Sequence, residues 1–329
     1  MRIDEAFDDF QKSVNEDIDQ TRLARDRRDL FRKALGSEPD VAEVFGSGSL
    51  SRSTQLKPIH DVDVVVVYDA VQHPGWGTPG LSAEQALDHT RGQVNRLLGK
   101  TNGTHGREVW RALPRNHAVK CFLDDSDDDS GFTVDVMPAR RQADGTLLIP
   151  EKLTQIWVPA HPEHLINLVA AHQGEWEHFR PLVRVLKRWR HDVPVPGRIK
   201  SLVMEVLALN CMPTSGNRAS GLRTFFTAAA ARVNEGVRDP ADLCGEIQPD
   251  LDYDGLQTAL AEAAELADRA CAAAAAGDTD DALRLWQEIL GDSFPAPAKP
   301  ARPITGAPAL ITGTPALITP RPIKDAPQG

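Results

Sequence analysis

Apolar residues recur at three- to four-residue spacing along the first 35 positions, where they alternate with charged residues. This pattern predicts one long amphipathic helix over 4–35, ended by Gly36. Three short elements are predicted next: a strand over 41–45, a Gly/Ser turn over 46–49 and a helix beginning near residues 49–51. Residues 60–68, HDVDVVVVY, alternate at first and then become continuously apolar. That change is typical of a central strand covered on both faces.

The remaining pattern divides the chain into two halves of different texture. A helix is predicted over 82–98, and two strands around 118–123 and 132–137 flank an acidic turn, DDSDDDSG. After Pro159 the pattern becomes helical, with helices predicted near 162–172, 176–191, 199–211, 218–235, 254–276 and 280–290. The pattern therefore predicts an α/β half followed by an all-helical half, with a first lobe over 1–158, including the N-terminal helix, and a second lobe over 159–292.

The last part of the sequence has a different composition. Nine prolines occur from residue 294 to the end, and two copies of a seven-residue unit, GAPALIT and GTPALIT, stand in tandem. Proline at this frequency prevents regular secondary structure, and two repeats are too few for a solenoid. We predict a flexible, disordered tail over 293–329.

Composition and charge narrow the classes of function. The net charge of −10 argues against a general nucleic-acid coat, because such binding depends on Lys and Arg. Residues 180–200 nevertheless hold seven Lys/Arg and one acidic residue, Asp192, which provides a local site for a phosphate-bearing ligand. No apolar run approaches the roughly 20 residues that a membrane span needs, and no export signal is visible, so we predict a cytoplasmic protein. The four cysteines form no CxxC pair, which suits a reducing compartment without a structural zinc.

Three aspartates carry the most specific chemical signal. Side chains alternate along a strand, so Asp61 and Asp63 share one face, and Asp135 repeats the apolar-Asp-apolar pattern on a later strand. Like charges held together need a cation, and Mg²⁺ prefers carboxylate and phosphate oxygens. Three carboxylates on neighbouring strands would hold two metal ions, an arrangement suited to in-line displacement at a phosphate.

The Gly/Ser turn ahead of these aspartates is predicted to bind phosphate. Gly46 and Gly48 permit close approach of the backbone, Ser47 and Ser49 offer hydroxyl groups, and the next helix directs its N-terminal amides at the anion. A dinucleotide-binding loop is disfavoured because the third glycine is missing. The DDSDDDSG turn is not a calcium loop, because Ser130 stands where that loop needs glycine.

These motifs resemble a known family. Gly46-Ser47, Asp61-x-Asp63 and Asp135 together resemble the DNA polymerase β-like nucleotidyltransferases. RVLKRW at 184–189 and IKSLVMEVL at 199–207 resemble the oligoadenylate synthetase and cyclic GMP-AMP synthase branch. The best match is to the bacterial cGAS/DncV-like nucleotidyltransferases of CBASS anti-phage signalling, over residues 1–292.

The resemblance implies an α+β fold class, with a mixed sheet in a polymerase β-like catalytic lobe and a second, helical oligoadenylate-synthetase-like lobe. It implies that Asp61 and Asp63 bind both Mg²⁺ ions, for which Mn²⁺ can substitute, and that Asp135 helps bind the ion that activates the acceptor hydroxyl. Family members make cyclic or linear oligonucleotides from NTPs and release pyrophosphate, and the expected product here is a cyclic di- or trinucleotide.

The resemblance also implies how the donor nucleotide is held. Ser47 would contact its triphosphate, Lys187 and Ser201 would hold the β and γ phosphates, and Arg52 is a weaker phosphate candidate.

His161 and His164 are expected simply to mark a helix end at the surface.

Partners follow from the same resemblance. In related bacterial systems a ubiquitin-activating-like ligase conjugates the terminal residue of such a tail, which makes Gly329 a candidate site, and an effector responds to the product. Two alternatives stay open: a terminal nucleotidyltransferase acting on an RNA, a protein or a small molecule, and a catalytically silent nucleotide-binding scaffold.

Overall fold

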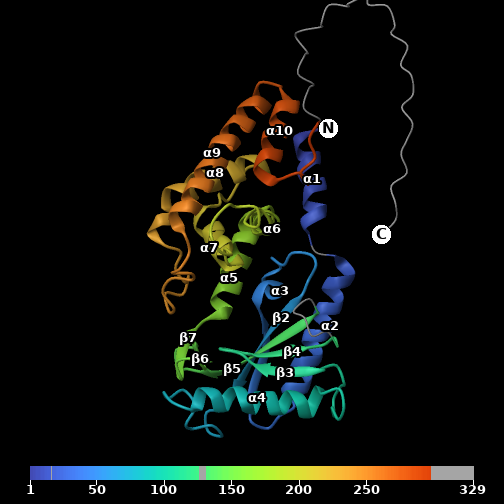
Figure 1. The fold of residues 1–329 in the computed structure, drawn as a ribbon, viewed down its shortest axis with the longest axis vertical. Helices are drawn as coiled ribbons and strands as arrows, with labels where there is room; N and C mark the ends of the chain where they lie inside the picture. Colours follow the sequence, from blue (N-terminus) through green and yellow to red (C-terminus); the bar gives the residue numbers. More distant parts are fainter. Residues whose placement is uncertain (16, 126–130, 298–329) are drawn as a thin grey trace, which may run out of the picture. The chain divides into compact units, whose positions relative to one another are not determined.

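The computed structural model describes residues 1–15, 17–125 and 131–297 (Figure 1). The predicted tail from residue 298 onward, with Gly329, lies outside the described residues, as does the centre of the predicted acidic turn. The helices are α1 (Ile3–Val14), α2 (Ile18–Leu35), α3 (Gly48–Arg52), α4 (Ser82–Leu98), α5 (Pro162–Glu175), α6 (Phe179–Trp189), α7 (Ser201–Cys211), α8 (Arg218–Arg232), α9 (Tyr253–Ala275) and α10 (Thr279–Leu290), with a 3₁₀ turn at Val233–Glu235.

A mixed sheet forms the first lobe. The strands described are β1 (Val41–Ser47), β2 (Asp61–Tyr68), β3 (Arg111–Pro114), β4 (Val119–Phe122), β5 (Thr133–Arg141), β6 (Leu147–Glu151) and β7 (Ile156–Ala160). Their order is β1-β2-β5-β4-β3, with β6 paired to β5 and to β7. The β2–β5 pair is parallel and the other pairs are antiparallel, so the predicted mixed sheet is confirmed.

Strand β2 is buried on both faces, as its apolar run predicts. Val64 and Val66 pack on one face in the core that includes residues of α2 and α4. Val65 and Val67 pack on the other face with residues of β5 and β6. Because side chains alternate along a strand, Asp63 lies on the same face as Val65, away from α2 and α4. Apolar burial on β2 thereby fixes which way its carboxylates point.

The second lobe is a group of helices around its own apolar core, drawn above the sheet in Figure 1. Helix α7 is apolar around its circumference, as expected for a helix enclosed by others. Phe179 and Trp286 are among the large side chains buried in this core. Helices α8, α9 and α10 begin at the side chains of Asn217, Asp252 and Asp278, each of which accepts a backbone N–H of the first turn.

The prediction of one N-terminal helix over 4–35 is wrong, because two helices form. Asn15 has an extended backbone, and the Asp17 carboxylate caps a new helix by accepting the N–H groups of Asp19 and Gln20. The two helices also belong to different cores. Phe7 and Phe10 of α1 pack in the helical lobe, whereas Phe31 of α2 packs against the sheet.

The sequence analysis also missed three strands, β3, β6 and β7. Each is short and contains a proline, Pro114, Pro150 or Pro159, a residue that weakens the sequence signal for a strand. At the other end, Phe294 lies within the segment predicted as tail, yet it is fully buried. Its ring centroid lies 5.1 Å from that of Phe7, so the packed fold extends at least to this residue.

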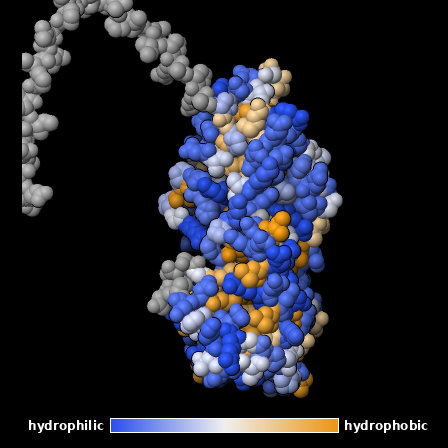
Figure 2. Space-filling view, turned by 90° about the vertical axis from the view of Figure 1, so that its right-hand side faces the viewer, coloured by the Kyte–Doolittle hydropathy of each residue, from blue (hydrophilic) through white to orange (hydrophobic). Residues whose placement is uncertain are grey.

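The surface is mainly polar. The face in Figure 2 is predominantly hydrophilic, with apolar residues gathered over its middle and lower part. Among the described residues, no helix combines the length and the apolar character that crossing a membrane requires.

Replacing Phe7 with Ala should destabilise the fold strongly. The side chain is fully buried, with its ring centroid 5.3 Å from that of Trp286. The cavity left behind should lower the free energy of unfolding by about 3–5 kcal/mol, measured by urea denaturation. The control Leu23→Ala, at a side chain that is largely exposed on α2, should change it by less than about 1 kcal/mol. Equal effects of the two substitutions would contradict the packing of α1 in the helical core.

Candidate active site

The three predicted carboxylates come together on neighbouring strands. In the parallel β2–β5 pair, Asp63 stands directly beside Asp135, and Asp61 pairs with Thr133. Adjacent strands lie about 4.8 Å apart, so Asp63 and Asp135 share one face at close range. Asp61 lies two residues earlier on that face. The geometry expected from the two apolar-Asp-apolar patterns is therefore present.

Two of the carboxylates, Asp63 and Asp135, lie where negative charge is poorly tolerated without a counterion. Burial, with the nearby charges of Asp61 and Asp135, raises the pKa of Asp63 to about 7, although Arg52 and Lys187 act in the opposite direction. Burial and the charge of Asp61 also raise the pKa of Asp135, against the effect of Lys120 and Arg115. Such shifts indicate a site that a cation would relieve.

The donor atoms fit a hard divalent cation. Asp135 Oδ1 is buried and has no hydrogen-bond partner among the described residues. Carboxylate oxygens are the ligands that Mg²⁺ prefers. A cation held by Asp61, Asp63 and Asp135 would satisfy this oxygen and remove the repulsion between the three groups.

The Gly/Ser turn packs directly onto these aspartates. Ser47 pairs with Asp63 across the β1–β2 ladder, and α3 begins at the next residue. Gly48 has a φ of +68°, and a Cβ there would overlap the Asp63 carboxylate. Only glycine meets both conditions. Gly46 is close to a different residue. A Cβ at this position would lie 2.7 Å from Cδ of Arg28, so the backbone of Gly46 packs against the Arg28 side chain of α2.

Two cavities adjoin the carboxylates. One, of about 340 Å³, is lined by Ser49, Asp61, Lys187 and Ser201, together with the cations Arg190 and Arg198. The other, of about 410 Å³, is lined by Ser47, Gly48, Asp63 and Asp135, with His117, His161, Asp239 and Cys244 on the remaining walls. Of the three predicted serines, Ser49 and Ser201 therefore line one cavity and Ser47 lines the other.

His161 stands at a helix end, as expected, but its side chain is partly buried and does not lie fully at the surface. It precedes α5 and lines the cavity of Asp135, and its Nδ1 is buried without a hydrogen-bond partner among the described residues. Sequence reasoning also gave no role to His117 or Asp239. No motif marks these residues, because loops far apart in the chain bring them to the cavity.

Lys187 is already fully engaged. Its ammonium lies 2.9 Å from Glu205 Oε2 and donates to Thr54 O at 3.0 Å and Thr54 Oγ1 at 3.1 Å. An ammonium has three donors, so all three are used. In this arrangement Lys187 supplies positive charge to the cavity wall, and a direct hydrogen bond to phosphate would require it to release a partner.

Glu205 is the centre of this buried network. Arg52 Nε donates to Glu205 Oε1 at 2.6 Å, and Thr54 Oγ1 donates to the same oxygen at 3.0 Å. Burial raises the pKa of Glu205, but the charges of Lys187 and Arg52 outweigh this effect and lower it to about 2. Arg52, the weaker of the phosphate candidates, is thus an ion-pair partner of Glu205, and it also lines the cavity of Asp135. A glutamate inside the otherwise apolar α7 was the signal for this network, because a buried carboxylate needs a partner.

Comparison with known proteins gives relatives of one kind. A search against models of protein families finds no match. A probable cyclic nucleotide synthase of Bacillus cereus is 24% identical over 88% of this chain and 97% of its own length. A cyclic AMP-AMP-GMP synthase of Enterobacter hormaechei is 23% identical over 90% of this chain and 93% of its own.

Solved structures show the same fold. Escherichia coli CdnC with ATP has a TM-score of 0.67 at 19% identity, covering 89% of this chain and 98% of that one. Bradyrhizobium diazoefficiens CdnG, a CD-NTase solved with GTP, has a TM-score of 0.63 at 14% identity and covers 88% and 95%. CdnC was also solved in a complex with a HORMA protein.

Asp63→Asn should change how stability depends on pH when no divalent metal is present. The raised pKa means that folded Asp63 keeps a proton that the unfolded chain releases near its ordinary value of 3.8. The wild type therefore loses stability as pH rises from about 4 to above 7, and the variant does not suffer this loss. At about pH 8 the variant should be more stable by up to about 4 kcal/mol, and at about pH 4 the difference should vanish.

Unfolding by urea across this pH range, with and without Mg²⁺, measures the effect. Added Mg²⁺ should stabilise the wild type and have little effect on Asp63→Asn. The exposed α2 variant Asp26→Asn is the matched control and should follow the wild type. A wild type that gains stability between pH 4 and 7 relative to Asp63→Asn would contradict the raised pKa.

Glu205→Gln should destabilise the fold by about 3–5 kcal/mol, because it leaves Lys187 and Arg52 as buried charges without an anion. Urea denaturation measures the loss. Glu262→Gln, at an exposed position on α9, serves as the control and should lie within about 0.5 kcal/mol of the wild type. A loss below about 1 kcal/mol for Glu205→Gln would show that the network does not hold the fold.

Proposed function

We propose that this chain, which belongs to the bacterial cGAS/DncV-like nucleotidyltransferases, makes a cyclic di- or trinucleotide second messenger from NTPs in CBASS anti-phage defence. The observation that carries the proposal is the placement of Asp61, Asp63 and Asp135 between two cavities large enough for nucleotide groups. The relatives named above as cyclic nucleotide synthases match along almost their whole length. Each bond formed would release pyrophosphate.

The carboxylates would hold the divalent ions of the reaction. Asp61 and Asp63 would bind both ions, and Asp135 would help bind the one at the acceptor. When bound, such ions polarise the attacking hydroxyl and neutralise the departing pyrophosphate. We propose Mg²⁺ as the natural ion, with Mn²⁺ as a substitute, because every donor in this set is an oxygen.

The cavity beside Asp61 would take the donor triphosphate. Ser49 and Ser201 offer hydroxyl groups there, and Lys187, Arg190 and Arg198 supply positive charge. This arrangement modifies the expectation for Ser47, which lines the other cavity with Asp135. We therefore assign Ser49 to the donor side and Ser47 to the acceptor side, next to Gly48.

The two alternative functions have less support. A terminal transferase would share the carboxylates, but the relatives reported above are cyclic nucleotide synthases. A silent scaffold would have no need for three carboxylates held together at the cost of their mutual repulsion.

The proposal also covers the substrates, the partners and the cellular location of this protein. NTPs are the substrates, the cytoplasm is the proposed location, and a downstream effector would read the product. We propose Gly329 as a site for conjugation by a ubiquitin-activating-like ligase, on the resemblance alone. A HORMA protein is a second candidate partner, because the structural neighbour CdnC was solved with one.

The first experiment incubates the purified chain with labelled ATP, GTP, CTP and UTP, singly and mixed, with Mg²⁺ or Mn²⁺. Phosphatase treatment and mass analysis should reveal phosphatase-resistant oligonucleotides and identify their bases. Asp61→Asn and Asp63→Asn should lower the rate by about 10³-fold or more, since metal ligation supplies several kcal/mol to the transition state. Asp26→Asn is the control and should keep full activity.

The alternatives give different results in the same assay. Products that phosphatase removes completely would indicate a linear-chain or terminal transferase. Nucleotide binding without pyrophosphate release under any combination would favour a scaffold. Full activity in Asp61→Asn would show that the carboxylates do not act as proposed.

A further inference from the structure

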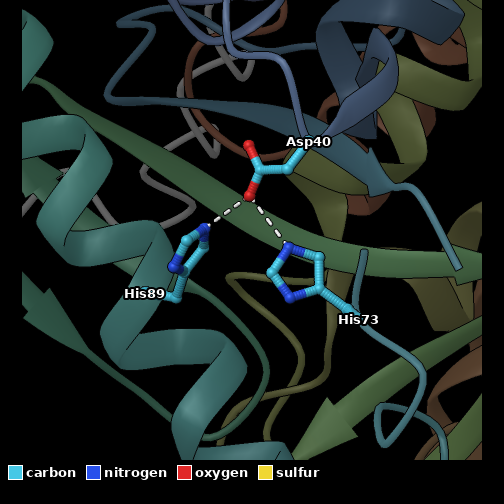
Figure 3. A group of neighbouring side chains, drawn as sticks. All are labelled: Asp40, His73 and His89. Carbon is cyan, nitrogen blue, oxygen red and sulfur yellow. Dashed lines mark hydrogen bonds and ion pairs between the residues drawn. The ribbon is translucent and has the colours of Figure 1, made fainter. Parts of the chain in front are cut away.

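A second group of metal-ligating side chains lies at the far end of the same strands. Asp40 directly precedes β1, whereas Ser47, beside the catalytic carboxylates, ends that strand. Seven residues of extended chain span about 23 Å. His73 follows β2 in a loop, and His89 lies on α4. The three side chains meet (Figure 3), and nothing in the proposed reaction uses them.

The two imidazoles converge on one carboxylate oxygen. Nε2 of His73 lies 2.8 Å and Nε2 of His89 lies 2.7 Å from Oδ2 of Asp40. The three ligand atoms all lie within 4.8 Å of one another. Each Nε2 therefore points at the same spot.

Neighbouring groups hold the ligands in place. Gln93 Nε2 donates to the other Asp40 oxygen at 2.9 Å, and the Tyr68 hydroxyl donates to Gln93 Oε1 at 2.7 Å. Trp76 stacks on His73 with ring centroids 3.9 Å apart. Supporting partners of this type orient the ligands of protein metal sites.

The ligand atoms are also reachable from solvent. Asp40, His73 and His89 line a cavity of about 460 Å³, with Gln72 and Arg96 on its rim. The His89 side chain is 37% exposed, while that of Asp40 is 11% exposed. The cluster thus combines a held carboxylate with an open side through which an ion can enter.

We propose that Asp40, His73 and His89 form a binding site for Zn²⁺, separate from the catalytic carboxylates. Two imidazole nitrogens and one carboxylate oxygen make a common ligand set for zinc, with the fourth position open to water. Ligands of a tetrahedral zinc stand about 3.3 Å apart, so Asp40 Oδ2 and the two rings need to separate by about half an ångström. Each neutral imidazole keeps one proton, which passes from Nε2 to Nδ1 by exchange with water.

The site would connect three segments that are distant in the sequence. It joins the turn before β1, the loop after β2 and helix α4. The cysteine spacing led us to expect no structural zinc, and the proposal departs from that expectation because this cluster contains no cysteine. Its ligands are 33 and 16 residues apart, so no local motif predicts it.

The test uses the tag-free full chain, stripped of metal and then given Zn²⁺ in the presence of excess Mg²⁺. Titration calorimetry and metal analysis after gel filtration should find about one Zn²⁺ per chain, and bound Co²⁺ should give visible absorption bands. His73→Gln and His89→Gln should each weaken Zn²⁺ binding by about 100-fold or more, at least as much as the loss of an outer partner. Bound zinc should raise the melting temperature of the wild type by a few degrees.

Two matched variants complete the design. His105→Gln, at an exposed histidine of another loop, should keep wild-type zinc affinity. Asp61→Asn should also keep it, which separates this site from the catalytic one and makes the result independent of the proposed function. Unchanged zinc affinity in His89→Gln, or loss of zinc in Asp61→Asn, would overturn the proposal. Because His89 is partly exposed, we expect His89→Gln to fold, so this variant tests the proposal even if His73→Gln fails to fold.

Discussion

One buried carboxylate, Glu205, forms ion pairs with two cations at the junction of the two lobes. Arg52, at the end of α3, comes from the sheet lobe, whereas Lys187 comes from α6 in the helical lobe. Thr54 completes the set by donating to Glu205 and accepting from Lys187. Removing two cations and an anion from water is costly, and their mutual attraction offsets the cost only when the geometry is good. The position of α3 beside the carboxylates therefore depends on α6 and α7.

This dependence links core packing to the chemistry of the site. Helix α3 begins at Gly48, which packs directly against Asp63. Asp63 is in turn fixed by β2, whose valines are buried on both faces. The carboxylate is thus held from the strand side by apolar packing and from the turn side by a glycine with no room for a side chain. Burial is the largest cause of the raised pKa of Asp63, and the like-charged neighbours, from which a group confined in this way cannot move away, raise it further.

Local patterns predicted most of the fold because the main elements carry their own signals. The helix predicted over 82–98 has the same bounds in the structure, and the apolar run after Asp61 forms the central strand. The three aspartates could be predicted to share a face because the period of a strand is two residues. The predictions of secondary structure failed where contacts between distant parts of the chain determine whether an element forms. The break at Asn15 separates helices that belong to different cores, and the short strands β6 and β7 stabilise each other by pairing.

The same limit applied to the sites. Ser47 and Ser49 look equivalent in sequence, and only the turn into α3 places them in different cavities. The resemblance implied that Lys187 holds phosphate, and the sequence carried no sign that Glu205 and Thr54 use its donors in the structure. The group of Asp40, His73 and His89 had no signal, because its members meet through the packing of a loop and a helix around the end of the sheet.

Two ligand sets of different chemistry thus occupy opposite ends of the same pair of strands. The carboxylates beside Ser47 offer only oxygen donors, which favour Mg²⁺. The group beside Asp40 offers two imidazoles, which favour zinc and other transition metals. Strands β1 and β2 are paired from Glu43 to Ser47, with an irregularity between Val41 and Glu43, and this ladder keeps the two ends apart. Because donor type and distance both separate the sites, each can select its ion without competing for that of the other.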